Sequence, residues 1–465
     1  MRRPASPRSA ERSALVRIER VGADGDGVGS YVAPSPNPLP QGEGASAPPP
    51  PVGGGREEGS VYIPLTLPGE TVRARVAGQR GTLDGIVGSS PARTEPPCPH
   101  FGTCGGCTLQ HWRDADYLAW KSIQLEAALR RAGFSDLPLS GAARTPPGAR
   151  RRMDFALRRT ASGVAIGLHR LRSTDVIDLQ TCLVLHPTLL GLIAPLRTLL
   201  VGLTLLRREG SAIAHLLDSG PDLLLRTDAE PSTSDRAALA DFARSHGIAR
   251  IHWAKGNGVP EPVCILRPAN VNLAGVPVTP PPGAFAQASA EGEQAIVAAV
   301  RAGLPPPRGA RARVVELFAG CGTITFALSA LARVTAYEGD VAAVAGLRQA
   351  ANRAGLAGQV EAVQRDLARQ PVSAKKLARA DAVVLDPPHA GAAPQMPAIA
   401  AARPERVIYV SCNPAALARD AAVLRQAGYR LMAVTLIDQF LWSARIESVC
   451  VFAADTPKRQ AALNF

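Results

Sequence analysis

The chain has 465 residues, of which 46% are hydrophobic, and a formal net charge of +13. It is long enough for two to four domains, and its eight cysteines are too few for a disulfide scaffold. The apolar run 189–206 is interrupted by Pro195 and Arg197, and the N-terminus lacks the apolar core of a signal peptide, so we expect a cytoplasmic protein without a membrane partner. The positive charge favours nucleic acid as the partner, although arginine enrichment can also reflect genome composition.

The first expected domain covers residues 1–88. Short strand-like pieces with glycine turns occupy 11–33 and 60–78. Between them, residues 35–59 are rich in proline and glycine and almost free of large apolar side chains, which predicts a disordered insert. Joined across this insert, the strands predict a small OB-like β-barrel, a fold that commonly binds oligonucleotides.

The second expected domain covers residues 89–277 and begins with clustered cysteines. Cys98, Cys104 and Cys107 have the spacing C-x5-C-x2-C among several glycines. Thiols this close together suggest a metal site, and both zinc and an iron–sulfur cluster suit them. Zinc ribbons usually show two CxxC pairs, whereas only one pair is present, and Cys182 is a distant fourth candidate. An amphipathic helix is expected to follow at 115–133.

Strand-like segments of this second domain are rich in arginine. Interleaved strands would place several of these side chains on one face, where they would contact RNA phosphates. The alternative is an ordinary solvated basic surface. The arginines concerned are Arg144, Arg150, Arg151, Arg152, Arg158, Arg159, Arg170 and Arg172.

The third expected domain covers residues 278–465 and alternates helix and strand, as in a doubly wound α/β sheet. In ELFAGCGT, a strand, a glycine turn and a helix follow one another, with Gly320 and Gly322 in the turn. Thr325 stands where a dinucleotide fingerprint has its third glycine, which disfavours NAD. Glu338, at the end of the next strand, suits a ribose diol, so the segment favours S-adenosylmethionine (SAM) over an ordinary tight turn.

Three further strand ends carry residues with possible chemical roles. Asp366 closes the third strand, where it would lie near the adenine, and Asp386 of the rigid Asp-Pro-Pro turn closes the fourth. Cys412 closes the fifth, and Asn413-Pro414 follow it. In an open α/β sheet these ends share one edge, where ligands bind. Cys412 is therefore either a nucleophile beside SAM or simply a half-buried thiol.

A thiol beside a methyl donor suits the methylation of a pyrimidine carbon. Attack of a thiolate on C6 of uracil makes C5 an enolate carbon that accepts a methyl group, after which a base must remove the C5 proton. Glu447, at the start of the last strand, is a candidate for this base. The alternative is that Glu447 is a surface acid paired with Arg445.

Taken together, SCNPAALARD, the Asp-Pro-Pro turn, ELFAGCGT and the terminal glutamate strand resemble the RNA uracil-C5 methyltransferases, which make 5-methyluridine in 23S rRNA and tRNA. Residues 97–112, PCPHFGTCGGCTLQHW, resemble the cluster segment of the family's iron–sulfur branch. The resemblance implies a TRAM-type OB domain, a central cluster-bearing domain and a class I methyltransferase domain. It further implies a 4Fe-4S cluster on Cys98, Cys104, Cys107 and Cys182.

Site residues follow from the same resemblance, with Cys412 as nucleophile and Glu447 as base. The positions that match contacts to SAM or the active site are Gln287, Phe318, Glu338, Asp366 and Asp386, and Gly320, Gly322 and Thr323 of the glycine turn are expected to bind SAM with them. Thr323, His389 and Arg445 depart from the usual Asn, Arg and His of the family. We expect a monomeric enzyme that uses SAM to methylate uracil C5, with 23S rRNA as its RNA partner.

Three alternatives to this hypothesis have to be weighed. The first is that the substrate is tRNA instead of 23S rRNA. The second is that the chain is a non-catalytic RNA-binding or assembly factor with a decayed methyltransferase domain. The third alternative, an RNA 5-methylcytidine methyltransferase, usually has a second cysteine after the proline of the strand-four motif. Here Pro387, Pro388 and His389 occupy that region, which argues against this alternative.

Overall fold

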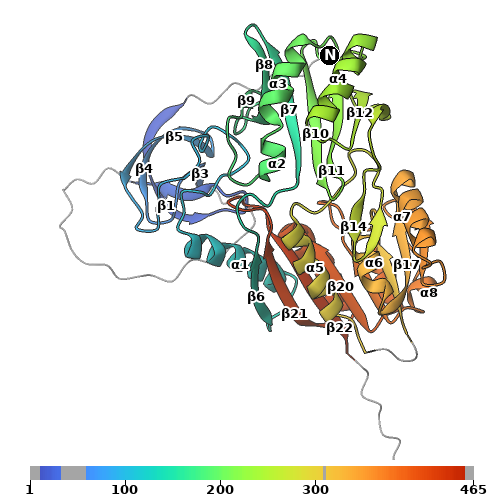
Figure 1. Ribbon diagram of the computed structural model, residues 1–465. Coiled ribbons are helices and arrows are strands. Elements are labelled where there is room, and N and C mark those ends of the chain that lie inside the picture. Colours follow the sequence, from blue (N-terminus) through green and yellow to red (C-terminus); the bar gives the residue numbers. More distant parts are fainter. Residues whose placement is uncertain (1–10, 33–58, 307–310, 456–465) are drawn as a thin grey trace, which may run out of the picture. The chain divides into compact units, whose positions relative to one another are not determined.

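The computed structural model describes residues 11–32, 59–306 and 311–455, and Figure 1 shows their helices and strands. The chain divides into two compact units. The first comprises Met1–Ala127 with Trp442–Arg445, and the second comprises Ala128–Leu441 with Ile446–Phe465. The predicted disordered insert lies almost wholly outside the described residues. Within the described part of the chain, no helix has the length and apolarity needed to cross a membrane.

A closed five-stranded barrel begins the first unit and confirms the predicted barrel. Alternate residues of its strands are buried, as expected for strands with one face toward a core; Val16 and Ile18 of the first strand meet Val72 and Ala74 of the fourth. In spatial order the strands are β1 (Arg12–Val21), β2 (Gly27–Tyr31), β3 (Val61–Ile63), β5 (Arg80–Gly88) and β4 (Thr71–Ala77).

The cysteine-bearing segment packs with the barrel in this first unit. Leu109 and Trp112 share an apolar cluster with Val21 and Leu67 of the barrel region, and Trp120 donates its indole N–H to the carbonyl of Val21 at 3.1 Å. Trp120 belongs to α1 (Asp114–Arg131), the helix expected at 115–133. The first unit therefore extends beyond the predicted boundary at residue 88.

Two sheets make up most of the second unit. The first has seven strands and is largely antiparallel, with helices α2 (Pro187–Leu190), α3 (Ile193–Gly202) and α4 (Thr233–Ser245). Its strands in spatial order are β13 (Glu261–Ile265), β12 (Arg250–Lys255), β11 (Gly220–Thr227), β10 (Glu209–Leu217), β7 (Arg152–Thr160), β8 (Gly163–His169) and β9 (Val176–Asp178). A two-stranded sheet, β14 (Val271–Leu273) and β15 (Val276–Val278), leads to the next part of the chain.

The eight-stranded sheet confirms the predicted doubly wound fold. Its strands in spatial order are β18 (Val360–Gln364), β17 (Ala332–Glu338), β16 (Ala312–Leu317), β19 (Ala382–Leu385), β20 (Arg406–Ser411), β22 (Glu447–Ala454), β21 (Tyr429–Asp438) and β6 (Leu139–Arg144). From β18 to β20 the strands run parallel, and β22 lies antiparallel between β20 and β21. The strand order reverses beside β16, which makes the edge beyond β16 and β19 the expected ligand site.

Helices cover both faces of this sheet. One apolar core joins alternate strand residues such as Ile408 and Val410 to helices α5, α6 and α7. Tyr409, between them, points to the opposite face and donates its hydroxyl to Asp420 of α10 at 2.7 Å. The helices are α5 (Ala290–Ala302), α6 (Thr323–Ser329), α7 (Val341–Arg353), α8 (Ala374–Leu377), α9 (Met396–Ala402) and α10 (Pro414–Gln426), several of which are labelled in Figure 1.

Candidate active site

The turn between β16 and α6 has the backbone geometry that its glycines predict. Gly320 and Gly322 have φ of +55° and +101°, and a side chain at Gly322 would come within 2.7 Å of the Phe326 ring. Phe318 also has a positive φ of +65°, an uncommon conformation for a residue with a side chain. The two glycines adopt these conformations without strain, and because they have no side chains a ligand can approach the backbone of the turn closely.

Glu338 at the end of β17 is fastened to this turn. Its two carboxylate oxygens accept the N–H groups of Gly320 and Asp340, each at 2.8 Å. Carboxylate oxygens have further lone pairs, so the group can still accept hydrogen bonds from a ribose diol. Asp366 lies two residues beyond the end of β18, which pairs with β17 through Gln364 and Glu338, and it is exposed. The predicted strand therefore ends earlier than its sequence suggested, but Asp366 stays at the same sheet edge.

The loop after β19 is tied to the loop after β20. Asn413 caps α10 by accepting the N–H groups of Ala415 and Ala416, and its amide donates to the carbonyl of His389 at 2.8 Å. Asp420 accepts the N–H of Ala392 at 2.6 Å. These contacts explain why Asn-Pro follows the strand: asparagine caps the helix, and proline suits its first turn. The same asparagine holds the Asp-Pro-Pro loop in place.

Cys412 and Glu447 occupy neighbouring strand ends. In the antiparallel pairing of β20 with β22, Ser411 lies opposite Ser448, so the next residue along each strand is Cys412 and Glu447 respectively. Cys412 is half-buried and Glu447 is only 3% exposed. The alternative of a surface glutamate is therefore wrong, and the nucleophile and base predicted from sequence lie next to each other.

Two buried glutamines connect Glu447 to Asp386. Gln287 donates its amide to Asp386 Oδ2 at 3.1 Å, and Gln439 donates to both Gln287 Oε1 and Glu447 Oε2 at 2.9 Å. Gln439 also accepts the N–H of Ala288 at 3.2 Å. Gln287 was predicted from the sequence, but Gln439 was not. The sequence feature that could have indicated Gln439 is its position as a polar residue directly after the apolar strand β21.

The carboxyl groups at this edge favour their protonated forms. Burial, and then the charge of Asp386, raise the pKa of Glu447 to about 8, while the hydrogen bond from Gln439 lowers it. Burial likewise raises the pKa of Asp386 to about 7, against the hydrogen bond from Gln287. Glu316, inside β16, is another acid that sequence reasoning missed; burial raises its pKa to about 8 despite its hydrogen bond to Thr325. Acids with such pKa values can exchange protons near neutral pH, as a catalytic base must.

The fold and this geometry agree with the relatives of the chain. A family model described as tRNA (Uracil-5-)-methyltransferase matches residues 307–454. An uncharacterised RNA methyltransferase of Rhizobium meliloti is 39% identical over 93% of this chain and 98% of its own. The 23S rRNA (uracil(1939)-C(5))-methyltransferase RlmD of Chromohalobacter salexigens is 35% identical over 86% of each chain.

The chain belongs to the RNA uracil-C5 methyltransferase family. A solved tRNA (uracil-54, C5)-methyltransferase of Pyrococcus abyssi, in complex with S-adenosyl-L-homocysteine, matches this methyltransferase with a TM-score of 0.65. It is 18% identical and the match covers 95% of this chain and 100% of the other, so it supports the fold. Family membership supports SAM as the methyl donor of this enzyme, in agreement with the glycine turn and Glu338.

The cysteine segment of the methyltransferase does not show a metal centre. Among the residues that the structure describes, no three His, Cys, Asp or Glu side chains are grouped so as to hold a metal ion. The segment does have features that suit thiolate ligands. Cys98, Cys104 and Cys107 are half-buried on one loop, and the N–H of Gly106 donates to Cys104 Sγ at 3.4 Å. The cluster stays a prediction.

Several of the arginines expected to contact RNA are instead bound within the protein. Arg159 donates to the carbonyl oxygens of Leu200, Val201, Leu203 and Leu206 around the end of α3. The guanidinium group of Arg159 thus already has carbonyl partners at the end of a helix, and the prediction that these arginines contact phosphates stays a prediction.

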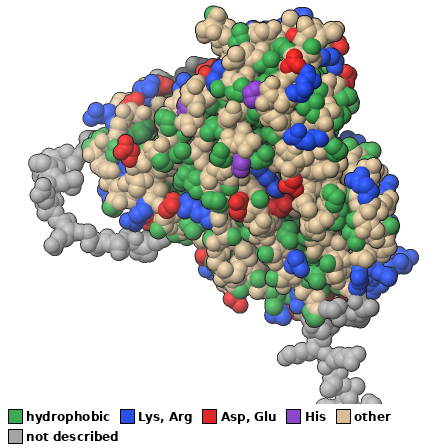
Figure 2. All heavy atoms as spheres, in the orientation of Figure 1, with side chains coloured by type: hydrophobic (Ala, Val, Ile, Leu, Met, Phe, Trp, Pro, Cys, Tyr) green, Lys and Arg blue, Asp and Glu red, His purple; other side chains and the backbone are tan. Residues whose placement is uncertain are grey.

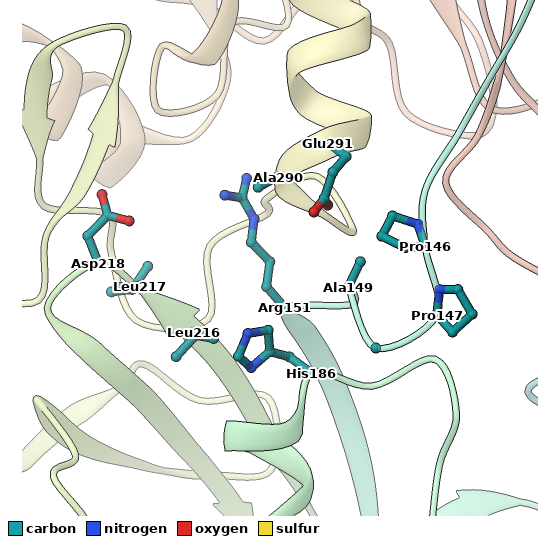
Figure 3. A pocket seen from close by; sticks show the side chains of 11 residues that line it. Pro146, Pro147, Ala149, Arg151, His186, Leu216, Leu217, Asp218, Ala290 and Glu291 are labelled. Carbon is teal, nitrogen blue, oxygen red and sulfur yellow. The ribbon is translucent and has the colours of Figure 1, made fainter.

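Arg151 and Arg152 support the segment that carries Gln287. Arg151 pairs with Glu293 at 2.5 Å and donates to the carbonyl of Gln287, while Arg152 donates to the carbonyl of Ala284. Arg151 also lines a cavity of about 490 Å³, where its side chain extends toward the start of α5 (Figure 3). The other residues lining this cavity include Pro146, Pro147, His186, Leu216, Asp218 and Glu291.

Proposed function

We propose that this chain uses SAM to methylate C5 of a uridine in RNA through a covalent adduct on Cys412. The observation that carries the proposal is the pairing of β20 with β22, which makes Cys412 and the buried Glu447 neighbours at the edge that also presents Asp386 and Glu338. In a methyltransferase domain that had lost its activity, we would not expect a nucleophile, a buried base and an intact glycine turn to occur together.

The chemistry follows from the two side chains. The Cys412 thiolate adds to C6 of uracil, and the electron pair moves onto the C5–C4–O4 enolate. C5 then attacks the methyl group of SAM, which leaves S-adenosylhomocysteine. Glu447 takes the C5 proton, the electron pair re-forms the C5–C6 double bond, and the cysteine leaves C6 as thiolate. Uracil must leave its base stack for these steps, so a single-stranded loop is the expected target.

The substrate we favour is 23S rRNA. The relative named for 23S rRNA methylation aligns over 86% of this chain, whereas the family model whose description names tRNA matches only the C-terminal part. The second candidate is tRNA, which the P. abyssi enzyme of similar fold acts on according to its description. A side-by-side assay of unmodified 23S rRNA and tRNA decides between them: strong tRNA methylation with none of rRNA would reject the favoured substrate.

A trapping experiment tests the chemistry separately. Fluorine at C5 cannot leave as a proton, so RNA with 5-fluorouridine at the target should form a stable methylated adduct with the protein. Cys412→Ala should abolish the adduct, whereas the matched variant Cys264→Ala, on β13 of the other sheet, should retain it. Methylation by Cys412→Ala would disprove the nucleophile.

We also propose that Cys98, Cys104, Cys107 and Cys182 hold a 4Fe-4S cluster with a structural or RNA-positioning role, because uracil methylation needs no electron transfer. The proposal rests on the cysteine spacing and its likeness to the iron–sulfur branch of the family. Anaerobically purified protein should be brown and contain iron and sulfide, and replacing any of the four cysteines by serine should bleach it. Protein that contains only stoichiometric zinc would overturn this assignment.

A further inference from the structure

Both N–H groups and the oxygen of the Gln439 amide have hydrogen-bond partners. One N–H donates to Glu447 Oε2 and the other to Gln287 Oε1, while its oxygen accepts the N–H of Ala288. Its side chain is buried, with 4% exposure. A flipped amide would bring its oxygen against two other oxygens, so the orientation shown is the one that the neighbouring groups allow.

The packing around Gln439 leaves its side chain little freedom to move. A side chain on Gly292, in the first turn of α5, would come within 2.8 Å of both Cβ and Oε1 of Gln439. The same turn is capped by Ser289, whose hydroxyl accepts the N–H of Gly292. Because Gly292 has no side chain, the side chain of Gln439 can pack directly against the first turn of α5, and this contact fixes its position.

This arrangement distinguishes the two oxygens of Glu447. Oε2 accepts the hydrogen bond from Gln439, whereas Oε1 is buried and has no hydrogen-bond partner among the described residues. A buried, unpartnered carboxylate oxygen is costly unless something else binds it. A proton taken from the substrate would satisfy this oxygen.

We propose that Gln439 is a positioning residue that fixes Glu447 so that Oε1 removes the C5 proton, and that Gln439 and Gln287 together join this base to Asp386. The inference rests on the proposed uracil methylation. Gln439 itself touches neither SAM nor the reacting atoms in this role; it acts through Glu447 and Gln287.

The electrostatic consequence of losing Gln439 has a definite sign. Its N–H lowers the pKa of Glu447 by stabilising the carboxylate, in opposition to burial and the charge of Asp386. Without this hydrogen bond the pKa rises further above the ordinary carboxyl value. Because Glu447 must be ionised to act as a base, the acidic limb of the pH–rate profile should move to higher pH.

The experiment compares Gln439→Met with Gln395→Met. Gln395 is also fully buried in this unit, but it exchanges hydrogen bonds with the backbone of Val372 instead of with the site. Tritium release from RNA labelled at uracil C5 measures turnover across pH, and denaturing gels measure the RNA–protein adduct. Titration with SAM, together with thermal unfolding, shows whether each variant is folded.

For Gln439→Met we expect the acidic limb to move up by about one pH unit, as for the loss of one hydrogen bond to a charged group. Turnover at neutral pH should fall about tenfold, methylated adduct should accumulate, and SAM affinity should stay unchanged. Gln395→Met should lose stability but keep the wild-type pH profile. If Gln439→Met proves too unstable, Gln439→Leu supplies a second variant without the amide.

The outcomes separate this inference from the function on which it rests. A wild-type enzyme that releases no tritium from any uridine-containing RNA would contradict the proposed function. If the wild type is active but folded Gln439→Met shows the wild-type pH profile and no excess adduct, the role of Gln439 is overturned and the proposed function stands. A shift of equal size in Gln395→Met would also overturn it.

Discussion

At the scale of single residues, burial distinguishes two glutamates of the eight-stranded sheet, Glu447 on β22 and Glu361 on β18. Glu447 is buried, whereas Glu361 on β18 is exposed and accepts a hydrogen bond from the Thr335 hydroxyl. The same side-chain type thus has a raised pKa where it is buried and lies at the surface in another place. The environment, not the residue type, assigns the role.

Glu447→Gln should stop the reaction after methyl transfer, because addition of Cys412 and attack by C5 do not need the carboxylate. A methylated RNA–protein adduct should therefore accumulate, visible on denaturing gels with labelled SAM. Glu361→Gln is the matched control and should turn over normally. Normal turnover by Glu447→Gln would mean that the base lies elsewhere.

Gly322→Ala should disrupt the cofactor turn. A left-handed conformation costs a residue with a side chain about 1–2 kcal/mol, and the new Cβ would also press against Phe326. We expect SAM binding to weaken about tenfold or more, as measured by isothermal titration. Gly358→Ala, where the added carbon meets nothing within 4 Å, should bind SAM like the wild type; equal affinity in both variants would contradict this account.

At the scale of elements, β16 contains an acid in the middle of an apolar strand. Glu316 is buried and accepts the Thr325 hydroxyl from α6 at 2.5 Å. Its pKa of about 8 in the folded protein exceeds that of an exposed carboxyl, so folding favours the protonated form. The contribution of this group to stability is thus fully present below pH values of about 4.3 and is lost as pH rises through about 8.

Glu316→Gln should remove this pH dependence while keeping a hydrogen-bonding side chain of similar size. We expect the melting temperature of the wild type to fall more between pH 6 and about 9 than that of the variant. Thermal unfolding followed by circular dichroism across this range measures the difference. Parallel curves for the two proteins would show that Glu316 is ionised in the fold.

Local sequence patterns allowed the strand, the glycine turn and the acid of the expected SAM site to be predicted. Gly320, Gly322 and Glu338 lie within one strand–helix–strand unit, so their spacing already carries the geometry. The link from Gln287 to Gln439 could not be predicted this way, because 152 residues separate the pair and only the pairing of β21 with β22 brings Gln439 to the edge. The carbonyl partners of Arg159 could not be predicted for a related reason: strand alternation shows which residues share a face, but not whether that face meets helices or solvent.

At the scale of the whole molecule, the distribution of positive charge bears on how RNA is bound. On the face shown in Figure 2, basic side chains form several separate groups with acidic ones among them. Arg170 and Arg172, near the turn between β8 and β9, are exposed, whereas Arg159 on β7 donates to protein carbonyls. The net charge of +13 favours RNA as a partner, and exposed arginines such as Arg170 and Arg172 are candidates for contacts with its phosphates.

RNA affinity should fall linearly with salt on logarithmic axes, with a slope that counts the phosphates contacted. Arg170→Ala and Arg172→Ala should each weaken binding and flatten the slope by about one. Arg159→Ala should lower the melting temperature and leave the slope unchanged. Filter-binding across a salt series gives these slopes, and unchanged slopes for Arg170→Ala and Arg172→Ala would place the RNA elsewhere.

The four residues Trp442–Arg445 are counted with the first unit, although the strands on both sides of them belong to the second. The carbonyl of Trp442 accepts the N–H groups of Thr108 and Leu109, and Ala444 packs against the apolar cluster of that unit. The chain therefore passes from one unit to the other between Gln439 and Glu447. A hybrid that took one unit from a relative would therefore also need a segment at 442–445 that matches the first unit, so we expect the two units to be inherited together.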